Sequence, residues 1–190
     1  MAAAEEAAAL LASLGHDVET AQPPTIRTEI LLALQTLFCA DMAARELSGR
    51  VPPVETLTPW SQTMIEAGRV IDAAHYVDAQ RVVLGACREV AKFFDHYDVL
   101  ITPTVAAAPP EVGRFAEIDF SRIFELWSLT PFTGMWNTTG QPAASLPWSL
   151  DAAGLPVGVQ IVGPPVGEVT VLRVAAQLEA AHPWTHRPQT

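Results

Sequence analysis

The chain has 190 residues, of which 49% are apolar and 17% are charged, and its formal net charge is −10. This length fits one domain with a hydrophobic core, and the composition is that of a folded chain and not of a disordered one. A single lysine and scattered arginines form no basic run, so neither nucleic acid nor an anionic membrane surface is an expected partner, because both require clustered positive charge.

The first half of the chain is predicted to be largely helical. Residues 2–14 form an Ala-rich helical pattern that ends at Gly15, and His16–Thr20 then reads as a short strand. Apolar residues recur with helical spacing over 25–48 and again over a long run from 59 to 94.

After residue 97 the period changes to that of short strands. The predicted elements are strands at 98–102, 143–146 and 157–162, with helices at 120–129 and 169–181. The turn residues Asp151–Gly154 predict an antiparallel hairpin between the last two strands. Because side chains alternate along a strand, we expect Val157, Val159 and Ile161 on one sheet face, and Gln160 with Gly158 on the other.

Helices around a few apolar strands indicate the α/β class, with flanking helices on a mixed sheet. Three or four strands make a thin sheet for 190 residues, so further sheet partners are expected from sequence that this chain does not contain.

The chain offers little catalytic chemistry of its own. Its five histidines share no ligand spacing, which leaves no predicted metal site, and no nucleotide-binding glycine motif is present, so no cofactor is expected. Cys39 and Cys87 form no CxxC pair, the N-terminus is acidic, and no apolar stretch reaches 18 residues, which together favour a cytoplasmic protein. Cys87 with His96 is the one nucleophile–base pair to consider, but helical spacing places them more than two turns apart.

Residues 131–147 hold the densest special chemistry. Glycines, prolines and small polar side chains force an irregular backbone there, and such segments often build binding sites. The alternative is a buried connection whose Asn and Thr side chains satisfy only backbone groups. The residue types alone favour neither interpretation.

This segment resembles the C-terminal conserved block of the amidase-signature family. The similarity continues over nearly the whole chain in four further blocks, which are Ala7–Val18, Tyr97–Thr104, Gly154–Gly163 and Leu172–Glu179. The Thr130–Thr133 motif and the chain's end are most similar to the 6-aminohexanoate cyclic-dimer hydrolase group.

The resemblance implies an α/β/α fold around one mixed sheet, and residues 1–190 would be the C-terminal portion of that amidase domain. It also implies hydrolysis of amide bonds by a Ser–cis-Ser–Lys triad, whose serines lie in and around a Gly-Gly-Ser-Ser-Gly-Gly loop. This sequence contains no such loop, and its only lysine, Lys92, matches no family position. No catalytic residue is therefore carried over.

The resemblance places Thr133, Trp136 and Asn137 at the wall of the substrate pocket. Asn and Thr can hydrogen-bond a substrate amide, and Trp can cover an aliphatic chain. Three hypotheses follow: an amidase polypeptide that lacks its triad and is inactive alone, a non-catalytic module that complements a separate chain carrying the triad, and an independent enzyme using Cys87 or His96. The expected partner is a small amide substrate once the missing half is supplied, and we expect the chain alone to self-associate through uncovered apolar surface.

Overall fold

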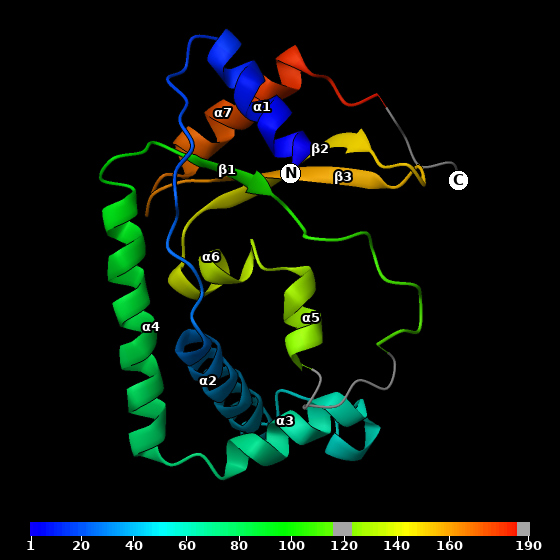
Figure 1. The fold of residues 1–190 in the computed structure, drawn as a ribbon. Helices are drawn as coiled ribbons and strands as arrows, with labels where there is room; N and C mark the ends of the chain where they lie inside the picture. The colour runs from blue at the N-terminus through cyan, green and yellow to red at the C-terminus, as the bar shows by residue number, and fades with distance from the viewer. Residues whose placement is uncertain (116–122, 186–190) are drawn as a thin grey trace. The chain divides into compact units, whose positions relative to one another are not determined.

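The computed structural model describes residues 1–115 and 123–185, and its elements are drawn in Figure 1. They are the helices α1 (Ala2–Ser13), α2 (Thr28–Leu47), α3 (Pro59–Arg69), α4 (Ala73–Phe93), α5 (Ile123–Leu129), α6 (Gly134–Thr139) and α7 (Glu168–Ala181), a 3-10 turn at Val54–Thr56, and the strands β1 (Leu100–Pro103), β2 (Ala143–Leu150) and β3 (Pro156–Val162). The α/β class is confirmed.

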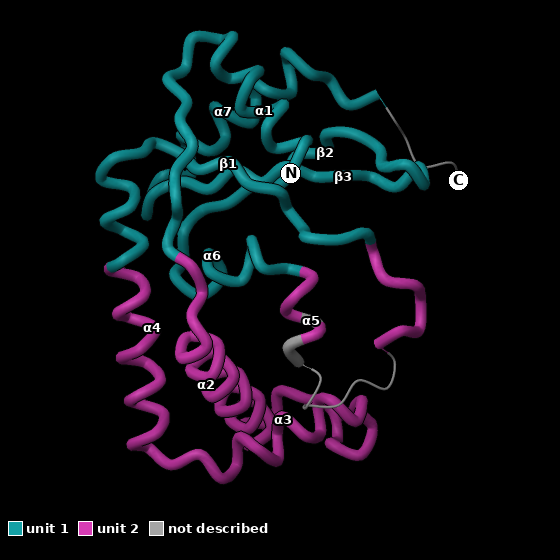
Figure 2. The backbone as a smooth tube through the Cα atoms, in the orientation of Figure 1, with its two compact units in different colours: residues 1–24, 89–108, 130–190 teal, residues 25–88, 109–129 magenta. Residues whose placement is uncertain are grey.

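Two compact units share the chain (Figure 2). The first comprises residues 1–24, 89–108 and those from 130 onward, and it holds the sheet together with α1, α6 and α7. The second comprises 25–88 and 109–129 and is helical wherever it has regular structure in the described residues.

The sheet of the first unit has the strand order β1-β3-β2, and both described pairings are antiparallel. β2 and β3 form the predicted hairpin. Its turn is closed by the Asp151 carboxylate, whose Oδ1 accepts from the amides of Ala153 at 2.9 Å and Leu155 at 2.8 Å. Gly154 has a φ of +78°, a backbone conformation that glycine adopts without steric cost.

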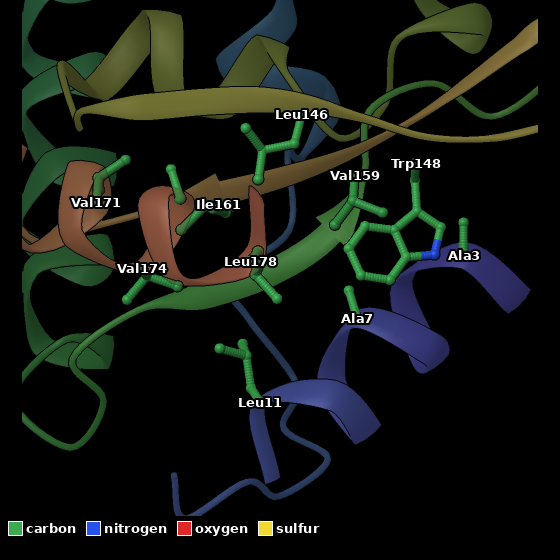
Figure 3. Packing of buried hydrophobic residues seen from close by; sticks show 11 residues of the cluster. Ala3, Ala7, Leu11, Leu146, Trp148, Val159, Ile161, Val171, Val174 and Leu178 are labelled. Atoms are coloured by element: carbon green, nitrogen blue, oxygen red, sulfur yellow. The ribbon is translucent and has the colours of Figure 1, made fainter. Parts of the chain in front are cut away.

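The core of this unit lies between one sheet face and the helices α1 and α7 (Figure 3). Val159 and Ile161 are completely buried there, and Val157 packs against them, as the alternation predicts. Trp148 Nε1 also donates to Glu6 Oε2 at 3.0 Å, which ties α1 to β2. The cluster consists of Ala3, Ala7, Leu11, Leu146, Trp148, Val159, Ile161, Val171, Val174, Ala175 and Leu178.

The second unit is organised around a close crossing of α2 and α3. A Cβ atom on Gly68 of α3 would lie 2.0 Å from the carbonyl oxygen of Cys39 in α2, so only glycine fits there. Ile30 of α2 and Ile65 of α3 are fully buried, and the Cys39 side chain is 2% exposed.

Two predicted elements differ from the structure. The predicted helix over 59–94 is two helices, because α3 ends at Arg69 and a new helix begins after Asp72, whose Oδ1 accepts from the His75 amide at 2.9 Å. The predicted strand His16–Thr20 pairs with no strand in the described part of the chain. The His16 amide instead donates to Leu11 O at 3.1 Å and closes the end of α1, where Gly15 has a φ of +95°.

The predicted helix over 120–129 is confirmed for the residues that the structure describes. α5 begins at Ile123, and residues 116–122 lie outside the described part of the chain.

Candidate functional site

The segment 131–147 folds into a short helix followed by a strand. Residue Thr133 precedes α6, and its carbonyl accepts from the Asn137 amide at 3.3 Å. The helix ends at Gly140, which has a φ of +77° and donates its N–H to Trp136 O at 2.8 Å. Glycine at this position allows the chain to reverse direction and enter β2 three residues later.

The threonine hydroxyl groups of α6 donate hydrogen bonds to backbone carbonyls of the same helix. Thr138 Oγ1 donates to Gly134 O at 2.6 Å, and Thr139 Oγ1 donates to Met135 O at 2.8 Å. The Thr139 hydroxyl also lies against Gln141 Oε1, and Gln141 is only 7% exposed. These two threonines therefore satisfy local groups, which is the structural role that the sequence left open.

A buried glutamine anchors the start of the segment to the sheet. Gln160 of β3 is 4% exposed and lies on the sheet face opposite the core. Its Nε2 donates to Phe132 O at 2.7 Å and to Thr102 Oγ1 at 2.9 Å. One side chain thus fixes the backbone immediately before Thr133 relative to both β3 and β1.

The same sheet face carries a row of polar side chains. Thr102, Gln160 and Ser145 lie directly opposite one another on β1, β3 and β2. Thr104 and Ser145 hydroxyls lie 2.7 Å apart, directly above Gly158, where a Cβ would be 2.7 Å from Thr104 Oγ1. The absence of a side chain at Gly158 leaves the room for this pair.

The three residues predicted to contact substrate are placed differently. Asn137 is exposed and Thr133 is half-buried, and with four-residue spacing they share one side of α6. Trp136 is 5% exposed and lies on the buried side. Its indole N–H has no hydrogen-bond partner among the described residues.

Gln160 lies on the predicted sheet face, but the sequence analysis gives it no role. One feature of the sequence could have indicated a role, because Gln160 is the only residue in 156–162 whose side chain can donate a hydrogen bond. A lone amide in a buried strand needs partners, and those partners turn out to belong to the candidate segment and to β1.

The candidate segment contains no group that could transfer a proton. Residues 130–147 include no Asp, Glu, His, Lys, Arg, Cys or Tyr. The only lysine, Lys92, is an exposed residue in the last turn of α4. No metal-binding cluster of His, Cys, Asp or Glu occurs within 1–115 and 123–185. The segment can therefore bind and orient a substrate through hydrogen bonds but supplies no acid, base or nucleophile other than hydroxyl groups.

A separate open cleft of about 480 Å³ lies in the second unit, between the end of α2 and the α3–α4 corner. Alanine residues and Gly68 form much of its lining. At its rim Arg69 binds Glu46 in a two-point ion pair, with N–O distances of 3.0 and 3.3 Å, which raises the pKa of Arg69 further. Asp72 also lines it, and hydrogen bonds from His75 lower the pKa of Asp72. None of the predicted substrate-contacting residues lines this cleft.

Comparison with known proteins identifies the family. The Amidase family model matches residues 1–172, so the chain belongs to the amidase family. The match includes the candidate segment and both strands of the hairpin. No described helix is both long and apolar enough to span a bilayer.

Among its relatives is the 6-aminohexanoate-cyclic-dimer hydrolase of Paenarthrobacter ureafaciens, which is 36% identical over 210 residues, covering 99% of this chain and 41% of the relative. A solved structure of 6-aminohexanoate cyclic dimer hydrolase matches with a TM-score of 0.89 and 33% identity, covering 99% of this chain and 42% of the other. One subunit of the glutamyl-tRNA(Gln) amidotransferase from Thermotoga maritima matches with a TM-score of 0.64 and 27% identity, covering 96% and 38%. The chain therefore spans about two fifths of the length of these relatives.

Proposed function

We propose that this chain forms the substrate-contacting part of an amide-bond hydrolase, and that polypeptide outside these 190 residues supplies the Ser–cis-Ser–Lys triad. Asn137 and Thr133 hydrogen-bond the substrate amide, and Trp136 supports their helix from its buried side. The substrate is a small amide. By itself the chain is inactive.

The observation that carries this proposal is the anchored, uncharged segment. Gln160 holds the backbone before Thr133 at 2.7 Å, and Asn137 stands exposed one turn further along. An exposed hydrogen-bonding side chain on an anchored backbone is suited to positioning a substrate. Membership of the amidase family supplies the reaction class.

A second form of the proposal is that the chain complements a separate polypeptide. Its support is the similarity to one subunit of an amidotransferase, since that relative is named as one part of an assembly. In either form of the proposal, the partner is the polypeptide that carries the triad, and the protein works in the cytoplasm. Without that polypeptide the chain self-associates.

The test compares the chain alone with the completed protein. The purified chain is incubated with small aryl amides and linear 6-aminohexanoate amides, first alone and then with the part of the P. ureafaciens hydrolase that it does not match. We expect turnover only in the mixture. Turnover by the chain alone that survives repurification and is lost in Cys87→Ala would contradict the proposal and favour an independent cysteine enzyme.

A substitution in the same mixture tests the binding residues. Asn137→Ala removes one neutral hydrogen bond, worth about 0.5–1.5 kcal/mol, so KM should rise by roughly 2- to 10-fold. The matched control is Glu179→Gln, which changes an exposed residue of α7 and should leave KM unaltered. An unchanged KM in Asn137→Ala would remove this residue from the site.

A further inference from the structure

We propose that the substrate of this site is an uncharged amide, and that Asn137 is the residue of this chain that selects it. The inference rests on the proposed function and names the substrate class within it: the acyl group carries neither a carboxylate nor an ammonium group close to the reacting carbonyl. It follows from the polar groups that the candidate segment leaves available and from the surface on which they stand.

The side-chain groups that α6 and the residue before it leave available are neutral. The hydroxyls of Thr138 and Thr139 already donate to carbonyls of the same helix. Thr133 Oγ1 donates to Thr130 O at 3.3 Å, which leaves its lone pairs able to accept. The Asn137 side chain is exposed and offers both an NH2 donor and a C=O acceptor. These groups complement the C=O and N–H of a substrate amide, and none of them carries a charge.

The elements on this side of the first unit contain no charged side chain. β1, β2, β3 and α6 include no Asp, Glu, His, Lys or Arg, although 17% of the whole chain is charged. In the described part of the unit, charged residues occur in α1, in α7, at the end of α4 and in connecting segments. α6 lies on the side of the sheet away from α1 and α7 (Figure 1). The sheet and α6 therefore offer a charged ligand no counter-ion.

A charged acyl group placed on this surface would lose hydration without gaining a partner of opposite charge. Met135 and Trp136, on the buried side of α6, are 3% and 5% exposed, so the helix stands on an apolar interior. Bringing an unpaired ion out of water onto such a surface is unfavourable, whereas a neutral alkyl or amide group is accepted at little cost. The kcat/KM of a charged substrate should therefore be at least about 10-fold below that of a neutral substrate of similar size.

Asn137→Asp tests the selecting residue at almost constant shape. The change replaces the NH2 of the exposed side chain by an oxygen and places one carboxylate on an otherwise uncharged surface. A substrate with an ammonium group then gains a counter-ion, while one with a carboxylate is repelled. The ratio of kcat/KM for the ammonium substrate to kcat/KM for the carboxylate substrate should rise at least about 10-fold. Glu179→Gln, which changes an exposed residue of α7, is the control and should leave this ratio unaltered.

The experiment uses the chain completed by the part of the P. ureafaciens hydrolase that it does not match. The substrates are the para-nitroanilides of butanoic acid, succinic acid and β-alanine, in which the same ethylene linker joins the carbonyl to a methyl, a carboxylate or an ammonium group. Release of nitroaniline at neutral pH, corrected for release without protein, gives kcat/KM for each substrate. We expect kcat/KM for the butanoyl anilide to exceed the other two values at least about 10-fold.

The outcomes separate the inference from the proposed function. Similar kcat/KM values for the three anilides would overturn the inference and leave the proposed function standing, and so would a ratio that Asn137→Asp does not change. If no anilide is hydrolysed, the proposed function is refuted, and binding of the same anilides to the mixture, followed by NMR at the Asn137 side-chain amide, decides the inference. Tighter binding of the butanoyl anilide would then uphold it, and equal or undetectable binding would overturn it.

Discussion

Gly68 provides the sharpest test of the structure of the helical unit. A Cβ atom there would lie 2.0 Å from Cys39 O, 2.6 Å from Cys39 C and 2.8 Å from Ala43 Cβ. Two of these atoms are backbone, so no side-chain rotation relieves the contact. To restore an ordinary contact, α2 and α3 must move apart by roughly 1 Å or more, which loosens the packing around Ile65, a fully buried residue one turn before Gly68.

The size of the effect of Gly68→Ala follows from two opposing terms. Overpacking of a tight contact costs about 1–3 kcal/mol, and the upper part of that range applies where backbone must shift. Alanine regains about 1 kcal/mol of helix propensity relative to glycine. The net expectation is a destabilisation of about 2 kcal/mol, equivalent to a fall in Tm of roughly 4–8 °C for a chain of this size.

Gly85→Ala is the matched control. Gly85 lies inside α4, and a Cβ built on it meets nothing within 4 Å. The same chemical change should therefore stabilise the chain by about 0.5–1 kcal/mol. Both variants are compared with the unsubstituted chain by urea unfolding followed by circular dichroism. If Gly68→Ala unfolds at the same or a higher urea concentration than the parent, the close crossing of α2 and α3 is refuted.

Three further predictions concern hydrogen bonds that the structure assigns to single side chains. Gln160→Leu leaves the Phe132 carbonyl and Thr102 without the donor that Gln160 supplies, and it should lower the free energy of unfolding in urea by about 1–3 kcal/mol; a neutral result would contradict the anchoring role. Asp151→Ala removes the acceptor that closes the hairpin turn and should cost about 1 kcal/mol, whereas Asp151→Asn, which keeps an acceptor oxygen, should cost less. Because hydrogen bonds from His75 lower the pKa of Asp72 in the folded chain, its stabilising contribution is present above the unfolded pKa and is lost as pH falls through the folded pKa. The Asp72→Ala variant should therefore be less stable than the parent at neutral pH, and its Tm should fall less than that of the parent as the pH is lowered. A pH profile of thermal unfolding that is the same in variant and parent would refute this assignment.

Local signals of the sequence were sufficient for the hairpin. Asp151 and Gly154 specify a turn, and the alternation of Val159 and Ile161 with Gln160 specifies which face is buried. These features depend on residues that are close neighbours in the sequence. The end of α1 was predictable for the same reason, because Gly15 supplies the positive φ that closes the helix.

The two incorrect predictions, a single helix over 59–94 and a strand at His16–Thr20, both relied on the spacing of apolar residues alone. Apolar spacing continued from α3 into α4, and the capping carboxylate of Asp72 that separates them was overlooked. The residues His16–Thr20 had the pattern of a strand, but a strand needs a neighbour, and none of the described strands pairs with them. Strand propensity is fulfilled only through pairing, which a single sequence does not reveal.

The role of residues 131–147 as a substrate site stays a prediction, but the structure shows a distribution of their side chains that the sequence did not reveal. Thr133, Trp136 and Asn137 were expected together, yet four-residue spacing keeps Thr133 and Asn137 on one side of α6 and turns Trp136 into the interior. The anchoring by Gln160 connects residues 28 positions apart, and no local rule predicts such a contact.

The chemistry of the candidate segment supports the proposed supply of catalytic groups by polypeptide outside these 190 residues. A hydrolase needs a nucleophile, a base and donors for the developing oxyanion, and residues 130–147 contain no ionisable side chain. A segment free of charge is well suited to lie beside a lysine and serines held elsewhere, because it adds no charge that would shift their pKa values while its amide and hydroxyl groups orient the substrate. Under the proposed function, such an arrangement works only if the two parts are held together within a fraction of an ångström, because catalysis requires that precision of its groups.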